Sequence, residues 1–242
     1  MIEASQGRLE NKLRKGMVIA MKMGCFARPP KFGKRLALMA AGVLLQGFGL
    51  SVLININLGT DPCSCLTQGI IRHINISFGT AQLLSQLVMF LVVIAFDRSL
   101  IGFGTLGNMI FVGYISDFWC WVWARVVPEG LFGRLPARWG LLLPTLAVFI
   151  FGAALYMSAG LGTSPYDGIP FIIASRLPKL RFRIVRVLWD FCFMAAGFVL
   201  GGDVGIVTLG VVLFLGPVIS WLKNRIEGML LGGENPGKAR RG

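Results

Sequence analysis

Six long apolar stretches occupy most of this chain, and they leave a lipid bilayer as the solvent that fits it. Each stretch reaches or approaches the ~17–25 residues with which a tilted helix crosses a membrane. Only 14% of the residues are charged, whereas a soluble domain carries about a quarter. The stretches lie at about residues 36–57, 80–97, 102–123, 140–160, 184–200 and 204–222. The pattern predicts an all-α integral membrane protein with about six transmembrane helices.

The chain also repeats itself. A shift of 103 residues places LGTDP at 58–62 over LGTSP at 161–165, and further along it places Gly102 over Gly205. The same offset holds without a gap across both units, so chance similarity is a poor explanation, and internal repeats of this kind define an architecture. The chain is therefore predicted to contain two copies of one three-span unit.

The positive charges indicate how the two units are oriented. With six spans and the N-terminus inside, 20 of the 24 Lys and Arg residues fall on the inner side and four on the outer side, as the positive-inside rule requires. A five-span arrangement would place the basic C-terminus outside, so six spans are favoured. Because three spans per unit is an odd number, the second unit is predicted to be inverted relative to the first, as in many secondary transporters.

These expectations divide the chain into five parts, with both termini on the cytoplasmic side of the membrane. They are a basic N-terminal tail at 1–35, a first membrane repeat at 36–124, an external linker at 125–139, a second membrane repeat at 140–222 and a basic C-terminal tail at 223–242. Anionic lipid headgroups are the expected partners of the basic tails. Nucleic acid is not, because the charges are not interleaved with stacking aromatic residues.

The LGTDP and LGTSP segments are referred to here as the first and second corners. Glycine and proline break a helix, and Pro62 and Pro165 suit the first turn of a new short helix. The small polar residues before each proline are suitable caps. Each corner thus presents a helix N-terminus that favours an anion or carboxylate. The alternative is a plain turn that caps a short interfacial helix.

Further candidates lie within or beside the predicted spans, where polar residues are expensive and often functional. Asp190 lies in the fifth span with Arg186 one turn earlier, an arrangement that also fits an internal ion pair. Asn108 follows a glycine cluster that permits close helix packing. The complete set of candidate substrate-binding residues is Thr60, Asp61, Gln86, Asn108, Thr163, Ser164, Asp167 and Asp190.

Signals for catalysis, metals and cofactors are missing from the sequence. The five cysteines form no CxxC pair, and His73 is the only histidine, so neither a metal site nor a disulfide framework is expected. The sequence contains no Walker A motif and no HExxH or GxSxG motif. We therefore expect no enzyme activity and no cofactor.

The order of these motifs resembles the YczE/YyaS/YitT group of bacterial membrane proteins. The resemblance runs from about residue 36 to 222 through LGTDP, GFGTLGN, FGAALYMSAGLGTSPYDG and GGDVGIVTLG. It implies a small multi-span inner-membrane protein of a group usually taken to be transporters. It also implies an acid after each corner, which the second unit keeps as Asp167 while the first carries Ser64, and a carboxylate at the place of Asp190.

The combined prediction is a secondary transporter or permease for a small solute. The basic surroundings favour an anionic or carboxylate-bearing solute. The alternative is a non-transporting membrane accessory or scaffold protein, in which the duplicated glycines serve packing alone.

Overall fold

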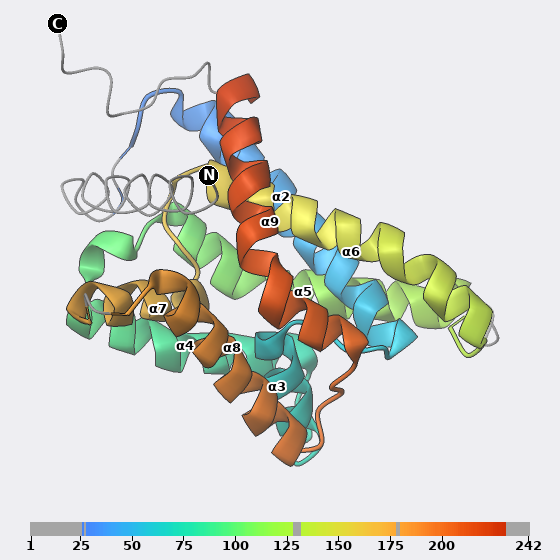
Figure 1. The fold of residues 1–242 in the computed structure, drawn as a ribbon. Coiled ribbons are helices and arrows are strands. Elements are labelled where there is room, and N and C mark those ends of the chain that lie inside the picture. The colour runs from blue at the N-terminus through green and yellow to red at the C-terminus, as the bar shows by residue number, and fades with distance from the viewer. Residues whose placement is uncertain (1–25, 27, 128–131, 178–179, 231–242) are drawn as a thin grey trace, which may run out of the picture.

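The computed structural model describes residues 26, 28–127, 132–177 and 180–230, and these residues form helices joined by short connections, with no strand among them (Figure 1). The helices are α2 (Phe32–Ile56), α3 (Pro62–Ile71), α4 (Phe78–Phe96), the 3₁₀ turn η1 (Arg98–Leu100), α5 (Phe103–Val126), α6 (Leu135–Ser158), α7 (Pro165–Arg176), α8 (Phe182–Val199) and α9 (Ile206–Leu230). The all-α prediction is confirmed, and a long helix covers each of the six apolar stretches.

By length and composition, three helices of the described residues can cross a membrane, namely α2, α4 and α6. Helix α9 is a fourth if its two parts, Ile206–Gly216 and Val218–Met229, count as one span bent by 50°. The bend falls at Pro217, which has no backbone N–H to donate. Helix α8 carries Arg183, Arg186 and Asp190 within its 18 residues, which lowers its apolar character. The chain is thus a helical membrane protein with three to four clear candidate spans.

The corners form the short helices that the sequence predicts. Pro62 is the first residue of α3 and Pro165 the first residue of α7. The side chain of Asp61 accepts a hydrogen bond from the backbone N–H of Ser64, and the side chain of Ser164 accepts one from the N–H of Asp167. Asp61 and Ser164, which occupy equivalent positions of the two units, are therefore the N-caps.

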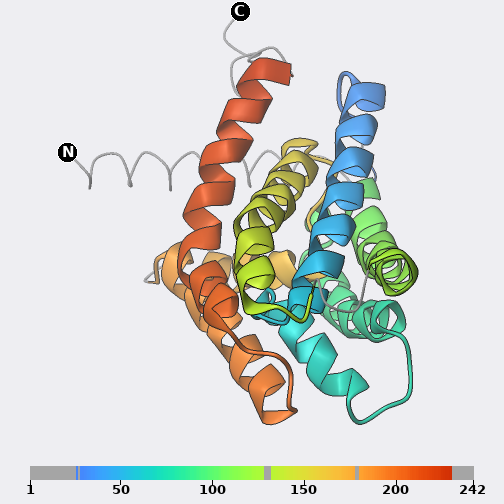
Figure 2. The same cartoon turned by 90° about the vertical axis from the view of Figure 1, so that its right-hand side faces the viewer.

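Helices α2 and α6 pack closely and run in opposite directions in both views (Figures 1 and 2). A Cβ atom added to Gly49 would lie 3.0 Å from Cβ of Phe149, and one added to Gly152 would lie 2.9 Å from the backbone N of Gln46. These two contacts are the same contact seen from either unit, since 49 and 152 differ by 103, as do 46 and 149. Small residues thus let the two backbones approach.

Each corner also packs against the start of the third long helix of the opposite unit. The backbone N–H of Gly104 donates to the carbonyl of Leu161 (2.8 Å), and the N–H of Val207 donates to that of Leu58 (3.4 Å). The glycine of each corner has a left-handed backbone conformation, with a φ of 99° at Gly59 and 111° at Gly162. Glycine adopts this conformation without strain. The same exchange of partners occurs at both corners.

The short helices follow this exchange. Helix α3 of the first unit packs on α8 of the second, and α7 of the second unit packs on α4 of the first. The two units are consequently interlocked, and the second long helix of each unit has a short helix from the other beside it.

Parts of three predicted segments, the two tails and the linker, lie outside the described residues. Most of the N-terminal tail (1–25 and 27) and residues 231–242 of the C-terminal tail lie outside them, as do residues 128–131 of the external linker. Helix α2 begins at Phe32, α6 begins at Leu135 inside the expected linker, and α9 continues to Leu230 inside the expected C-terminal tail.

Alanine at Gly102 or at Gly205 is expected to destabilise the protein. A Cβ at Gly102 would collide with the carbonyl oxygen of Leu161, and a Cβ at Gly205 with that of Leu58. Backbone atoms cannot turn aside as a side chain can, so each change should cost about 1–3 kcal/mol. Thermal unfolding of the detergent-solubilised protein measures the effect. Gly140 has no atom within 4 Å of an added Cβ and provides the matched control Gly140→Ala. A Gly102→Ala variant as stable as this control would contradict the packing described.

Candidate functional site

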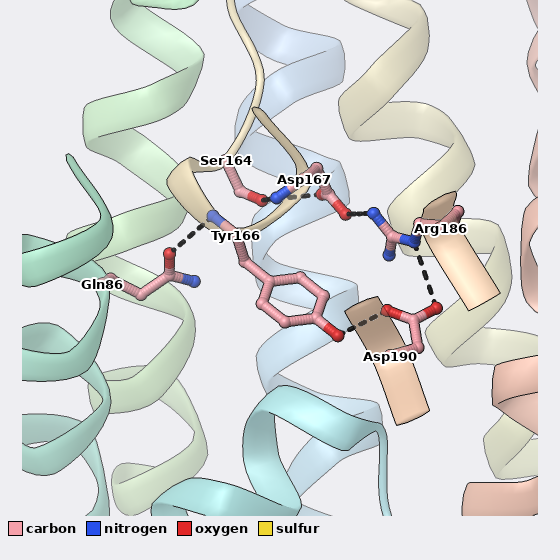
Figure 3. A network of polar contacts seen from close by, with 6 residues as sticks. All are labelled: Gln86, Ser164, Tyr166, Asp167, Arg186 and Asp190. Carbon is pink, nitrogen blue, oxygen red and sulfur yellow. Dashed lines mark hydrogen bonds and ion pairs between the residues drawn. The ribbon is translucent and has the colours of Figure 1, made fainter. Parts of the chain in front are cut away.

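A buried polar network lies where α7, α8 and α4 meet (Figure 3). At its centre the guanidinium of Arg186 pairs with two carboxylates, donating from Nη1 to Oδ1 of Asp167 (2.5 Å) and from Nε to Oδ2 of Asp190 (3.1 Å). Asp190 is only 3% exposed, and the side chains of Arg186 and Asp167 are 17% and 16% exposed. Arg186 therefore bridges α8 to α7 inside the protein.

Tyr166 completes the network from α7. Its hydroxyl donates to Oδ1 of Asp190 (2.5 Å), and its backbone N–H donates to Oε1 of Gln86 (3.2 Å). Its ring packs edge-on against Phe193 with centroids 5.0 Å apart, and the Arg186 guanidinium lies 5.2 Å from its centroid. One tyrosine thus ties Asp190 to α7 and to a glutamine of the first unit.

Local sequence accounts for most of these positions. Ser164 and Asp167 are three residues apart at the start of α7, and the Ser164 hydroxyl donates to Oδ2 of Asp167 (2.7 Å) in addition to capping its N–H. A carboxylate in the first turn of a helix is stabilised by the helix dipole. Arg186 and Asp190 are four residues apart, so they lie on the same face of α8.

The network is formally unbalanced in charge. It contains two carboxylates and one guanidinium, and the first corner adds Asp61, which interacts electrostatically with Asp167. The charges of the network therefore do not cancel one another.

The structure brings together four of the eight candidate residues. Ser164, Asp167 and Asp190 belong to the network, and Gln86 joins it through the backbone N–H of Tyr166. The other four lie apart from it. Asn108 donates to Oε1 of Gln46 (2.8 Å) between α5 and α2.

The three remaining candidates are corner residues. Asp61 caps α3, Thr60 is 1% exposed and makes a long hydrogen bond of 3.5 Å to the carbonyl of Asp61, and the buried hydroxyl of Thr163 has no hydrogen-bond partner among the described residues. The corners thus serve local structure at Thr60 and Asp61, whereas the second corner also contributes to the ion network.

Sequence reasoning missed Tyr166 and gave Arg186 only the role of a neighbour of Asp190. Tyr166 follows the second corner directly, and the equivalent residue of the first unit is Cys63. A small residue is thus replaced by a phenol, next to an acid that only the second unit carries. This difference between the units was the sequence signal that could have identified Tyr166.

The network belongs to one half of the repeat. The counterparts of Asp167, Arg186 and Asp190 are Ser64, Leu83 and Leu87, none of which carries a charge. The second unit therefore supplies the charged groups, and the first supplies Gln86.

A recess of about 490 Å³ opens at the surface beside the first corner. The residues that line it are Asn57, Leu58, Gly59, Trp139, Phe198, Gly202, Asp203, Val204, Gly205 and Ile206. None of the eight candidate residues is among them, so this recess and the ion network are separate features. Among the described residues, no group of three or more His, Cys, Asp or Glu side chains is placed to hold a metal ion.

Replacement of Arg186 by Met should destabilise the protein strongly, because it leaves two buried carboxylates without their cation. Loss of one partner from a buried pair costs about 3–5 kcal/mol. The double variant Arg186→Met/Asp190→Asn should recover part of this loss. Thermal unfolding of the unmodified protein, the two single variants and the double variant gives the coupling free energy between the two residues.

The exposed pair Arg72–Asp203 is the matched control. Its atoms are 2.7 Å apart, with side chains 54% and 28% exposed, so Arg72→Met should cost no more than about 1 kcal/mol. Equal losses for Arg72→Met and Arg186→Met would contradict the buried network.

Comparison with known proteins places the chain in a family. Residues 33–224 match the model of a family of unknown function (DUF6198). The chain is 30% identical over 196 residues to an uncharacterized protein of Haemophilus influenzae, covering 80% of this chain and 85% of the relative. From Bacillus subtilis, it is 23% identical to the uncharacterized membrane protein YczE (74% of this chain, 80% of the relative) and 25% identical to the uncharacterized protein YyaS (69% and 82%). No solved structure matches it. The resemblance seen in the motifs is thereby confirmed, and the chain belongs to the DUF6198 family, together with relatives of the YczE and YyaS type.

Proposed function

We propose that this protein is a secondary transporter for a small solute, built from two inverted three-span units in a bacterial inner membrane. The observation that carries the proposal is the buried Asp167–Arg186–Asp190 network of the second unit, to which Gln86 of the first unit is joined through the backbone of Tyr166. Ionisable groups inside a membrane protein are costly and typically mark ion or substrate pathways. A scaffold would have no evident need for three of them at this place.

The contacts between the units support the inverted arrangement. Helices α2 and α6 occupy equivalent positions in the repeat, both are candidate spans, and they run in opposite directions. The contacts of Gly49 and Gly152 are exchanged between the units, and so are the hydrogen bonds of Gly104 and Val207. A pseudo-twofold axis perpendicular to α2 and α6 accounts for this exchange. Such an axis lies in the plane of the membrane in many secondary transporters.

The ends of the described helices fit a cytoplasmic location of both termini. The beginning of α2 and the end of α9 lie at the same end of the molecule (Figure 2). An even number of spans, six, produces this arrangement, and the bias of Lys and Arg places that end on the inner side. Anionic headgroups of the inner leaflet are then the partners of the two basic tails.

A carboxylate-bearing solute is the substrate class that suits the site. Arg186 offers a planar donor group that matches a carboxylate, and it is already paired with two protein carboxylates that a solute could replace in turn. The N-terminal ends of α3 and α7 also favour negative charge.

Uptake into proteoliposomes tests the proposal. The purified protein is reconstituted and assayed against a panel of small carboxylic acids and neutral solutes, with and without a pH gradient. Asp190→Asn should reduce the initial uptake rate about tenfold or more, the effect of some 1.4 kcal/mol on a barrier.

The matched control is Asp117→Asn on α5, where the carboxylate accepts a hydrogen bond from the backbone N–H of Gly79 (2.9 Å) and is not part of the network. This variant should transport at close to the normal rate. Equal uptake by the two variants would contradict the assigned site, and a lack of uptake for every solute would favour the scaffold.

A further inference from the structure

The charged network also indicates which ion drives transport. We propose that Asp190 binds a proton, and that this proton moves Arg186 from a position shared between two carboxylates to Asp167 alone. The inference rests on the proposed function, because it assigns the coupling ion of the same site. It is carried by the geometry of the three charged groups and by the hydroxyl of Tyr166.

The network contains more negative than positive charge. Asp167 and Asp190 share a single guanidinium, that of Arg186, at 2.5 and 3.1 Å. With all groups ionised the network carries a net charge of minus one in a buried environment, where uncompensated charge is costly. One bound cation removes it. A metal cation would be repelled by the guanidinium in contact with both acids, whereas a proton on a carboxylate would not.

The two acids differ in how well their negative charge is stabilised. Asp167 lies in the first turn of α7, where the helix dipole favours an anion, and it accepts hydrogen bonds from Ser164 and Arg186. Asp190 lies in the middle of α8, far from either helix end, and is 3% exposed. Asp190 is therefore the acid that accepts the proton.

The groups around Asp190 come from three helices. Arg186 faces it from its own helix α8, Tyr166 and Asp167 from α7, and the thiol of Cys63 from α3. Helix α4 contributes Gln86, which does not titrate and contacts the backbone of Tyr166. Of these, Arg186 and Tyr166 stabilise the ionised form of Asp190, and Asp167 opposes it.

The step itself is a simple proton transfer. A hydronium ion gives its proton to Oδ2 of Asp190 and becomes water, and the carboxylate becomes a neutral carboxylic acid. The protonated Oδ2 no longer attracts the Nε–H of Arg186, while Oδ1 still accepts from Tyr166. The guanidinium then pairs with Asp167 alone, and its fork can bind that carboxylate through two N–H groups. Proton binding thereby changes the contact between α8 and α7, next to the second corner.

Infrared difference spectroscopy of the reconstituted protein tests this directly, because a buried carboxylic acid has a C=O stretching band that a carboxylate lacks. A pH step from alkaline to acidic should produce such a band in the unmodified protein. The band should be absent in Asp190→Asn and present in Asp117→Asn, whose carboxylate lies outside the network.

A milder variant guards against loss of folding. Tyr166→Phe keeps the ring packing against Phe193 and removes only the hydroxyl that donates to Asp190. Because that hydrogen bond favours the ionised acid, its loss should move the midpoint of the band to higher pH by about one unit. A Tyr114→Phe change on α5, at a half-exposed tyrosine outside the network, should leave the midpoint in place.

Two results would overturn the inference. One is a pH-dependent band that persists in Asp190→Asn, and the other is an unchanged midpoint in Tyr166→Phe. Neither requires a known solute, so the outcome is independent of the uptake assay. A protein that transports solute without the band would refute the proton site alone, and one that shows the band without any uptake would refute the transport function alone.

Discussion

The close approach of each corner to the opposite unit is the constraint on which the rest of the structure depends. Glycines at 102 and 205 leave no room for a side chain against the corner carbonyls of Leu161 and Leu58. From these contacts the short helix after each corner continues beside the opposite unit. The exchange of α3 and α7 follows from it, and so does the position of Tyr166 between α4 and α8.

This interlocking explains why a polar network can be buried in so apolar a protein. Arg186 and Asp190 would be an isolated pair on α8, but α7 packs beside them and contributes Asp167 and Tyr166. Each charged group then has a partner of opposite sign or a hydrogen-bond donor, which burial requires. The charged residues therefore lie where helices of the two units pack together, and a change in their charge can alter this packing.

Much of the fold could be predicted because it depends on local patterns. The apolar stretches gave the long helices, and Pro62 and Pro165 gave the starts of the short ones. The candidate site was predicted only in part. Spacing within one helix identifies a pair such as Arg186 and Asp190, but the hydrogen bond between Tyr166 and Asp190 joins residues on different helices and depends on tertiary packing. The contact between Asn108 and Gln46 could not be predicted for the same reason, since it joins residues of α5 and α2.

The opposite orientation that we propose for the two units in the membrane is tested most directly by the side on which their equivalent residues lie. Arg72 and Ser175 differ by 103 positions, and both are exposed just at the end of α3 and α7. In a variant without its native cysteines, Arg72→Cys should react with a membrane-impermeant maleimide only from outside sealed cells. Ser175→Cys should react only from the cytoplasmic side, in inverted vesicles. Labelling of both positions from the same side would contradict the inverted, interlocked arrangement.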